Sequence, residues 1–212
     1  TLTSITGYSW FDGQVTNYFD QQAPSGAIVE NSVYNKYPEN FKQFSQEVRL
    51  LSPTGGTLEY VVGAYYDTSR YHVDPYLGYD FPISAYFPSG LYSMNQTYFS
   101  QQARTLSAFA QATVRPTAGL RLIGSLRYTN THKQGDFYGP VLLAGGVYKP
   151  STSASGSISE GLADPSITVQ YDVSRNFMIY AVYGRGSKSG GFVSNTVGTK
   201  DATFIYKPER SR

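Results

Sequence analysis

The fold is decided by residues 105–131, TLSAFAQATVRPTAGLRLIGSLRYTNT. Apolar and mainly polar positions alternate along both halves of this stretch, and the turn residues 116–119 separate the two halves. A period of two places successive side chains on opposite faces of a pleated β-strand. We therefore predict an antiparallel hairpin with strands at 105–115 and 120–131, each with one apolar face.

The same alternation recurs elsewhere in the chain and predicts an all-β fold. Further strands are expected at 2–8, 41–52, 57–69, about 165–172 and 176–188, which brings the total to about seven. The last run has apolar residues on both faces, so the direction in which each face points stays open. Composition agrees, because aromatic residues reach 16% and the 21 Gly and 11 Pro are spread along the chain, as strands and turns require.

Short and long connections alternate between these strands. The short ones are 52–56, 116–119 and 172–176, and the long ones are roughly 12–40, 71–103 and 134–160. An antiparallel meander would therefore carry tight turns at one end and long loops at the other, as outer-membrane barrels do. A strand of about 12 residues, tilted near 45°, covers about 28 Å along the membrane normal. We predict an antiparallel up-and-down transmembrane β-barrel.

In such a barrel the apolar face meets lipid and the polar face lines the lumen. The polar residues expected in the lumen form a wet wall rather than a ligand site, and they are Glu47, Arg49, Glu59, Asp67, Arg121 and Arg127. Seven is an odd number of strands, and an open array leaves two unpaired edges that lipid cannot satisfy. The strands are therefore expected to belong to a larger barrel.

Four segments resemble the TonB-dependent receptor family. LTSITGY (2–8) resembles an early barrel strand of that family, and FSQEVRL (44–50) resembles its FSQE strand, followed here by VGAYY (62–66). LSAFAQA (106–112) and GSLRY (124–128) resemble its FGQ and GLRYT hairpin. YAVYGRGSKSGGF (180–192) is the most specific segment and resembles YASYSRGYKSGGF, while YKPE (206–209) resembles the PE before the next barrel strand.

The resemblance implies a 22-stranded barrel filled by an N-terminal plug, in the outer membrane of a Gram-negative bacterium. Residues 1–212 would then be roughly a third of that barrel, with the plug domain and the C-terminal strands absent. The implied partners are outer-membrane lipid, TonB through a missing N-terminal segment, and a ferric siderophore or a similar scarce nutrient. The identity of the ligand cannot be read from the sequence.

Ligand contacts are expected in the aromatic-rich segment 71–103, taken as an extracellular loop. Tyr and Phe supply large contact areas at low entropic cost. The expected ligand-binding residues are Tyr71, Tyr76, Tyr79, Phe81, Tyr86, Phe87 and Tyr92. Some of these aromatics could instead belong to the interfacial girdle or pack within the loop. The segment 134–160, rich in Gly, Ser and Ala, is expected to be mobile cover.

Other classes of function find little support. The net charge of +2 is carried by interspersed charges and gives no basis for nucleic-acid binding. The stretch 184–191 is not a phosphate-binding loop, because Ser187 precedes Lys188 instead of following it. His72 and His132 have no metal-ligand spacing around them, and Cys is absent. We expect no cofactor and no enzymatic activity.

Two alternatives stay open beside a receptor. A passive outer-membrane channel without a plug has the same alternation and loop asymmetry, although the family-like segments at 44–50 and 180–192 weigh against it. An excised β-rich fragment could also assemble edge to edge into fibril-like structures.

Overall fold

The computed structural model describes residues 1–22, 28–74, 76–79, 94–95, 98–143, 147–194 and 204–211. Its strands are β1 (Leu2–Gln22), β2 (Ile28–Leu51), β3 (Leu58–Val73), β4 (Tyr76–Tyr79), β5 (Met94–Asn95), β6 (Tyr98–Thr117), β7 (Leu120–Leu143), β8 (Val147–Ser174), β9 (Phe177–Gly184), β10 (Gly186–Lys188), β11 (Gly191–Phe192), β12 (Ile205–Tyr206) and β13 (Glu209–Ser211). The long strands pair antiparallel in the order β1-β2-β3-β6-β7-β8-β9, which confirms the predicted up-and-down sheet of seven strands.

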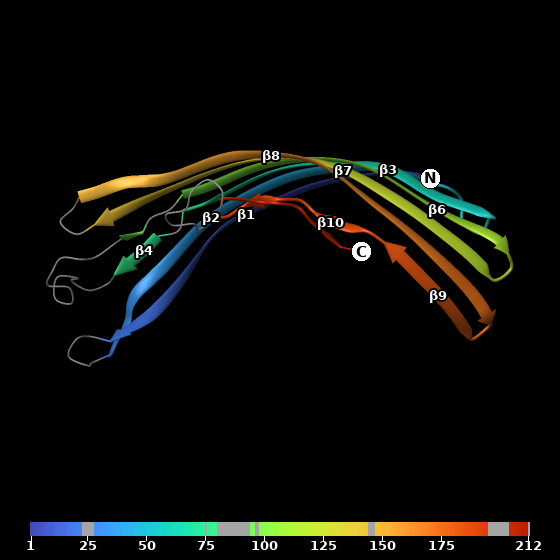
Figure 1. Ribbon diagram of the computed structural model, residues 1–212, viewed down its shortest axis with the longest axis horizontal. Helices are drawn as coiled ribbons and strands as arrows, with labels where there is room; N and C mark the ends of the chain where they lie inside the picture. Colours follow the sequence, from blue (N-terminus) through green and yellow to red (C-terminus); the bar gives the residue numbers. More distant parts are fainter. Residues whose placement is uncertain are drawn as a thin grey trace.

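The sheet is bent into an arch with a convex and a concave face (Figure 1). Tight turns close it at one end: Arg175 and Asn176, for example, form the turn between β8 and β9. The long hairpins reach out at the opposite end. The segment that starts at β10 lies beneath the arch, on the concave side (Figure 1). Within the described residues no helix is long and apolar enough to cross a membrane.

Register places the apolar residues of the strands on the convex face. One row across the sheet consists of Leu50, Val62, Ala110, Leu126 and Pro165. These residues have no covering layer: Leu126 is 51% exposed and Val62 is 40% exposed. Soluble monomers rarely leave such a wide apolar area open to water. We call this surface the apolar band; it extends from the tight turns to an edge marked by Phe44, Tyr66, Leu106 and Tyr128, one on each strand.

The strands are much longer than the sequence pattern predicts. The expected loop 12–40 is mostly strand, because β1 and β2 stay paired out to Gln22 and Ile28. The expected loop 134–160 is also mostly strand, with β7 and β8 paired out to Leu143 and Val147. Within 71–103, strands β4 and β5 pair with β2 and β7. The prediction of long loops was therefore wrong for these residues.

The physical reason is that a backbone ladder does not need an apolar face. Residues 151–161 of β8 read STSASGSISEG, in which small residues prevail and Ile158 is the one large apolar residue. Beyond the apolar band the convex face meets water, so large apolar side chains are not required on that face. The strands continue because their backbone N–H and C=O groups still pair across the hairpin.

The predicted strand 176–188 is broken at Arg185. β9 ends at Gly184, and the Arg185 N–H donates to the carbonyl of Pro165 at 2.9 Å. In an antiparallel ladder the N–H of Pro165 would return this bond, but proline has no N–H. The ladder therefore stops here and the chain leaves the sheet. Along β9, register puts Ile179, Ala181 and Tyr183 on the convex face.

Gly63 in β3 permits a close approach between three strands. An added Cβ would lie 2.5 Å from Cζ of Phe109 and 2.8 Å from the carbonyl oxygen of Val48. The phenyl ring of Phe109 can rotate away, but the Val48 carbonyl belongs to the paired backbone of β2. Gly124 in β7 has no such neighbour, since nothing lies within 4 Å of its added Cβ.

We expect Gly63→Ala to lower the free energy of unfolding by about 1–3 kcal/mol, because the methyl group overpacks the contact between β2 and β3. Gly124→Ala is the matched control and should change that free energy by less than about 0.5 kcal/mol. The measurement is urea unfolding of the full-length chain in lipid vesicles. Equal effects of the two substitutions would contradict the close packing at Gly63.

Candidate functional site

The concave face carries the polar residues of the strands. Asp164 and Glu160 of β8 point to this face, because both contact the segment that lies beneath the arch. Register extends the same face across the sheet. All six polar residues predicted for the lumen lie on it: Glu47, Arg49, Glu59, Asp67, Arg121 and Arg127.

Most of these charges are neutralised within the wall itself. Arg49 lies 3.5 Å from Glu47. Arg115 reaches Glu59 at 2.8 Å, and both carboxylate oxygens of Asp172 accept from Arg121 at 2.7 Å. Such exposed pairs contribute little to stability. Their effect is to leave a hydrated wall without a concentrated charge.

Arg127 is held by aromatic rings instead of a carboxylate. Its guanidinium carbon lies 5.6 Å from the ring centroid of Tyr65 and 5.7 Å from that of Phe109. Nη2 of Arg127 also donates to Oγ of Ser107 at 3.2 Å. Cation–π contacts of this length are attractive, so the side chain has a fixed position on the concave face.

Four polar contacts fasten residues 187–190 to the concave face; we call these residues the inner segment. Nζ of Lys133 donates to Oγ of Ser189 and, at 2.7 Å, to the carbonyl of Gly190. The Gly190 N–H donates to Oε2 of Glu160 at 3.0 Å. Oγ of Ser187 donates to Oδ2 of Asp164 at 2.8 Å.

Lys133 lies beyond the apolar band and is half-buried. Burial lowers the pKa of its ammonium group, and the nearby Glu160 carboxylate opposes this shift. Two acceptors on the inner segment and a carboxylate beside them favour the charged form that donates these bonds. Lys133 is therefore the cation that couples β7 to the inner segment.

The glycines of the SGGF motif allow this close contact. A Cβ on Gly190 would lie 2.5 Å from the carbonyl oxygen of Tyr206, and one on Gly191 would collide with the Tyr206 hydroxyl. β11 pairs with β12 at this point, Gly191 opposite Tyr206. Any larger residue would push the two short strands apart.

A buried aromatic cluster lies at the hairpin end of the same face. It consists of Val73, Phe99, Phe137, Ala154, Ile158, Phe192 and Phe204, with Tyr71 packed against it. Phe204 is 1% exposed, and its ring centroid is 5.1 Å from that of Phe192. The cluster joins the ends of β3, β6, β7 and β8 to the segment that follows β10.

The predicted ligand-contacting residues do not form one loop. Tyr71 lies in β3, where its ring centroid is 6.2 Å from that of Phe99. Burial raises the pKa of the Tyr71 hydroxyl, and the Glu39 carboxylate adds to the shift. Tyr76 and Tyr79 belong to strand β4, so their assignment to a loop was wrong. Phe81, Tyr86, Phe87 and Tyr92 lie outside the described residues.

Sequence reasoning missed the fastening of the inner segment and the aromatic cluster. The sequence pattern gives no signal for Lys133, Glu160 lies at the edge of the expected loop 134–160, and Phe137 lies within that loop. Local sequence gives little indication of these three residues, because each contacts a partner in a distant part of the chain. Only the family-like SGGF motif hinted at a close backbone contact.

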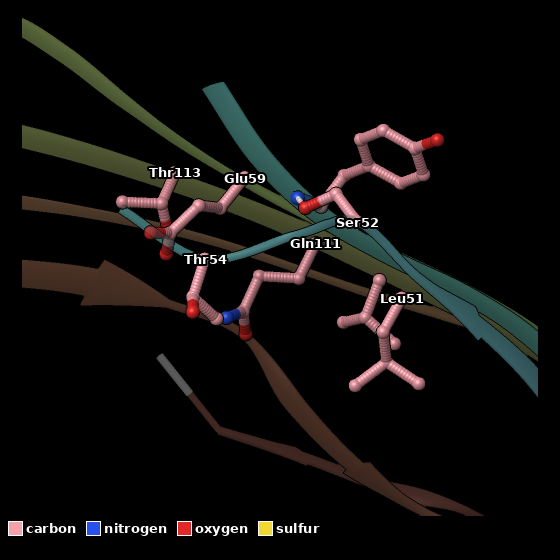
Figure 2. Close-up of a pocket in the computed structure, with 8 residues that line it drawn as sticks. Leu51, Ser52, Thr54, Glu59, Gln111 and Thr113 are labelled. Carbon is pink, nitrogen blue, oxygen red and sulfur yellow. Dashed lines mark hydrogen bonds between the residues drawn. The ribbon is translucent and has the colours of Figure 1, made fainter. Parts of the chain in front are cut away.

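A shallow pocket of about 170 Å³ lies at the opposite, tight-turn end, where Figure 2 shows Glu59 beside Thr113 and Thr54 beside Gln111. Its carboxylate is already occupied, since Glu59 accepts from the Gly55 N–H at 2.6 Å and pairs with Arg115. No group of three or more His, Asp or Glu in the described part of the chain could hold a metal ion. The candidate site is therefore the hairpin end of the concave face.

We expect Lys133→Met to loosen the inner segment. The substitution removes two hydrogen bonds from a charged donor, while the unbranched Met side chain keeps a similar length. Amide hydrogen exchange of residues 189–192 should accelerate by roughly tenfold or more, given that hydrogen bonds to charged groups contribute about 1.5–3 kcal/mol. Lys188→Met is the control, since Lys188 is exposed in β10. Unchanged exchange in Lys133→Met would rule out the coupling.

Comparison with known proteins identifies the family. The family model described as TonB dependent receptor-like, beta-barrel matches residues 1–212. No curated protein matches the chain. Among solved structures, the ferric yersiniabactin uptake receptor FyuA from Yersinia pestis has a similar fold, with a TM-score of 0.68 and 17% sequence identity. The alignment covers 97% of this chain and 29% of that receptor chain.

The family match spans every described strand, and the family is one of receptors rather than enzymes. The arched sheet and the alternation of its faces agree with a barrel wall. The chain belongs to the TonB-dependent receptor family and lies within its β-barrel region.

Proposed function

We propose that the chain is part of the wall of an outer-membrane receptor that takes up ferric siderophores or another scarce nutrient. The observation that carries this proposal is the division of the sheet into an open apolar face and a polar face. Val62 and Leu126 are exposed on the first, whereas the arginine–carboxylate pairs lie on the second. Family membership and the likeness to a receptor for ferric yersiniabactin support uptake over a purely structural role.

In this proposal the convex face meets the lipid of a Gram-negative outer membrane, and the concave face is the lumen wall. Glu47, Arg49, Glu59, Asp67, Arg121 and Arg127 then face water in the lumen. Glu47, Arg49, Glu59 and Arg121 form ionic pairs within the wall, which suits a wall past which a ligand moves, because these paired charges would not trap it. TonB supplies the energy through a segment of the full-length protein outside residues 1–212.

Ligand contact is proposed for the aromatic residues around the hairpin end. Tyr71 lies at the edge of the buried cluster, so its ring has a fixed position while its hydroxyl stays near Glu39. We extend the proposal to Tyr76, Tyr79, Phe81, Tyr86, Phe87 and Tyr92, which follow it in the chain. Rigid aromatic rings bind aromatic or apolar ligands at low entropic cost.

The division into a lipid face and a lumen face can be tested on adjacent valines of β3. Val62 lies on the convex face and Val61 on the concave face. We expect Val62→Arg to cost about 2–4 kcal/mol of folding free energy, because the charge enters the middle of the apolar band. Val61→Arg should cost clearly less. Urea titration of the full-length chain in lipid vesicles measures both, and equal costs would argue against a lipid-facing convex surface.

Transport can be tested by growth under iron restriction. Cells that carry the intact gene should grow on at least one ferric siderophore from a chemically diverse panel, and deletion of the gene should abolish that growth. Deletion of TonB should have the same effect, since passage of a large ligand requires energy coupling. Growth that persists without TonB would favour a passive channel. A Tyr71→Ala variant should bind the ligand identified in this way more weakly.

A further inference from the structure

A band of cations crosses the convex face just beyond the apolar band. It consists of Lys42 in β2, Arg70 in β3, Arg104 in β6 and His132 in β7; we call these four residues the cation band after the charges of Lys42, Arg70 and Arg104. Lys42 lies directly opposite Arg70, and Arg104 lies directly opposite His132. Arg70 faces Gln102, so Arg104 is its diagonal neighbour. The four residues are thus contiguous across four strands.

This arrangement is unfavourable without an anion. Like charges directly opposite each other on a sheet repel, and the Lys42–Arg70 pair is such a case. The contrast with the concave face is clear, because Arg49, Arg115 and Arg121 each have a carboxylate within 4 Å. Among the residues that the structure describes, Lys42, Arg70 and Arg104 have no such partner. His132 contacts only a hydroxyl, with Nδ1 at 2.7 Å from Oγ of Ser159.

The depth of the cation band matches a lipid headgroup layer. Each of the four residues lies two or four residues beyond the edge of the apolar band on its own strand, for example Lys42 beyond Phe44 and Arg70 beyond Tyr66. At about 3.3 Å per residue and a tilt near 40°, this is roughly 5–10 Å along the membrane normal. The headgroup region on each side of a bilayer core is of similar thickness, about 5–8 Å.

We propose that the cation band binds the phosphate groups of lipids in the membrane leaflet at the hairpin end of the barrel. Arginine guanidinium groups bind phosphate oxygens in a bidentate geometry, and lysine adds a compact positive charge. The apolar band next to the cations receives the acyl chains of the same lipids. This inference rests on the proposed membrane location of the convex face.

The test uses the full-length chain in phosphatidylcholine nanodiscs with a small fraction of spin-labelled phosphatidic acid. The control lipid is spin-labelled diacylglycerol, which differs from phosphatidic acid only in lacking the phosphate group. We expect the protein to prefer phosphatidic acid, and the triple variant Lys42→Gln/Arg70→Gln/Arg104→Gln to weaken this preference by roughly tenfold or more. Arg49→Gln is the control, since it removes a cation from the concave face of the same strand as Lys42.

The outcomes separate this inference from the proposed function. Equal binding of the two lipids, or unchanged preference in the triple variant, would overturn the lipid site while the receptor proposal stands. Displacement of phosphatidic acid by an equal concentration of inorganic phosphate would mean a site for free anions and would also overturn it. Failure of the wild-type chain to insert into nanodiscs would contradict the proposed membrane location itself. Heat-modifiable gel mobility shows that each variant is folded.

Discussion

The structure depends on one antiparallel register that continues from strand to strand. Between β3 and β6 it runs without a shift from Leu58 opposite Val114 to Val73 opposite Phe99. Because side chains alternate at a period of two, a slip of one residue would turn every apolar side chain to the concave face. The ionic pairs, the apolar band and the fastening of the inner segment all require that this slip does not happen. Backbone pairing therefore sets the chemistry of both surfaces.

The sequence predicts the parts of the fold in which two different environments lie on the two sides of a strand. In Leu58 to Tyr66 and Leu120 to Tyr128 the charged residues all fall on one face and most apolar residues on the other, so their strands and their facing follow from the pattern. The hairpin ends escape prediction, since residues such as 151–161 are mostly small, and the burial of Ala154 and Ile158 depends on Phe192 and Phe204 from a distant part of the chain. The end of β9 also escapes, because it depends on Pro165 in a neighbouring strand. The site combines both problems: Lys133 and Ser189 are distant in sequence and meet only after the sheet has formed.

Two kinds of contact hold the chain that follows β9 on the concave face. Near β10 the contacts are polar and few, with Lys133, Glu160 and Asp164 as anchors. Farther along they are apolar, with Phe192 and Phe204 inside the aromatic cluster. Polar contacts of this kind exchange readily with water, whereas the burial of two phenyl rings is costly to reverse. The polar end is thus the easier end to release.

The length of the hairpins beyond the apolar band restricts how this protein can vary in evolution. The ladder between β7 and β8 continues past the band and shifts once, between Gly139 and Val141, where Pro140 of β7 lies opposite two residues of β8, Pro150 and Ser151. A hairpin that gains one residue pair at its base turns every side chain beyond that point to the other face. A gain of two pairs keeps the facing. Relatives that differ in hairpin length should therefore differ by even numbers of pairs, with odd changes absorbed at bulges such as the one at Pro140.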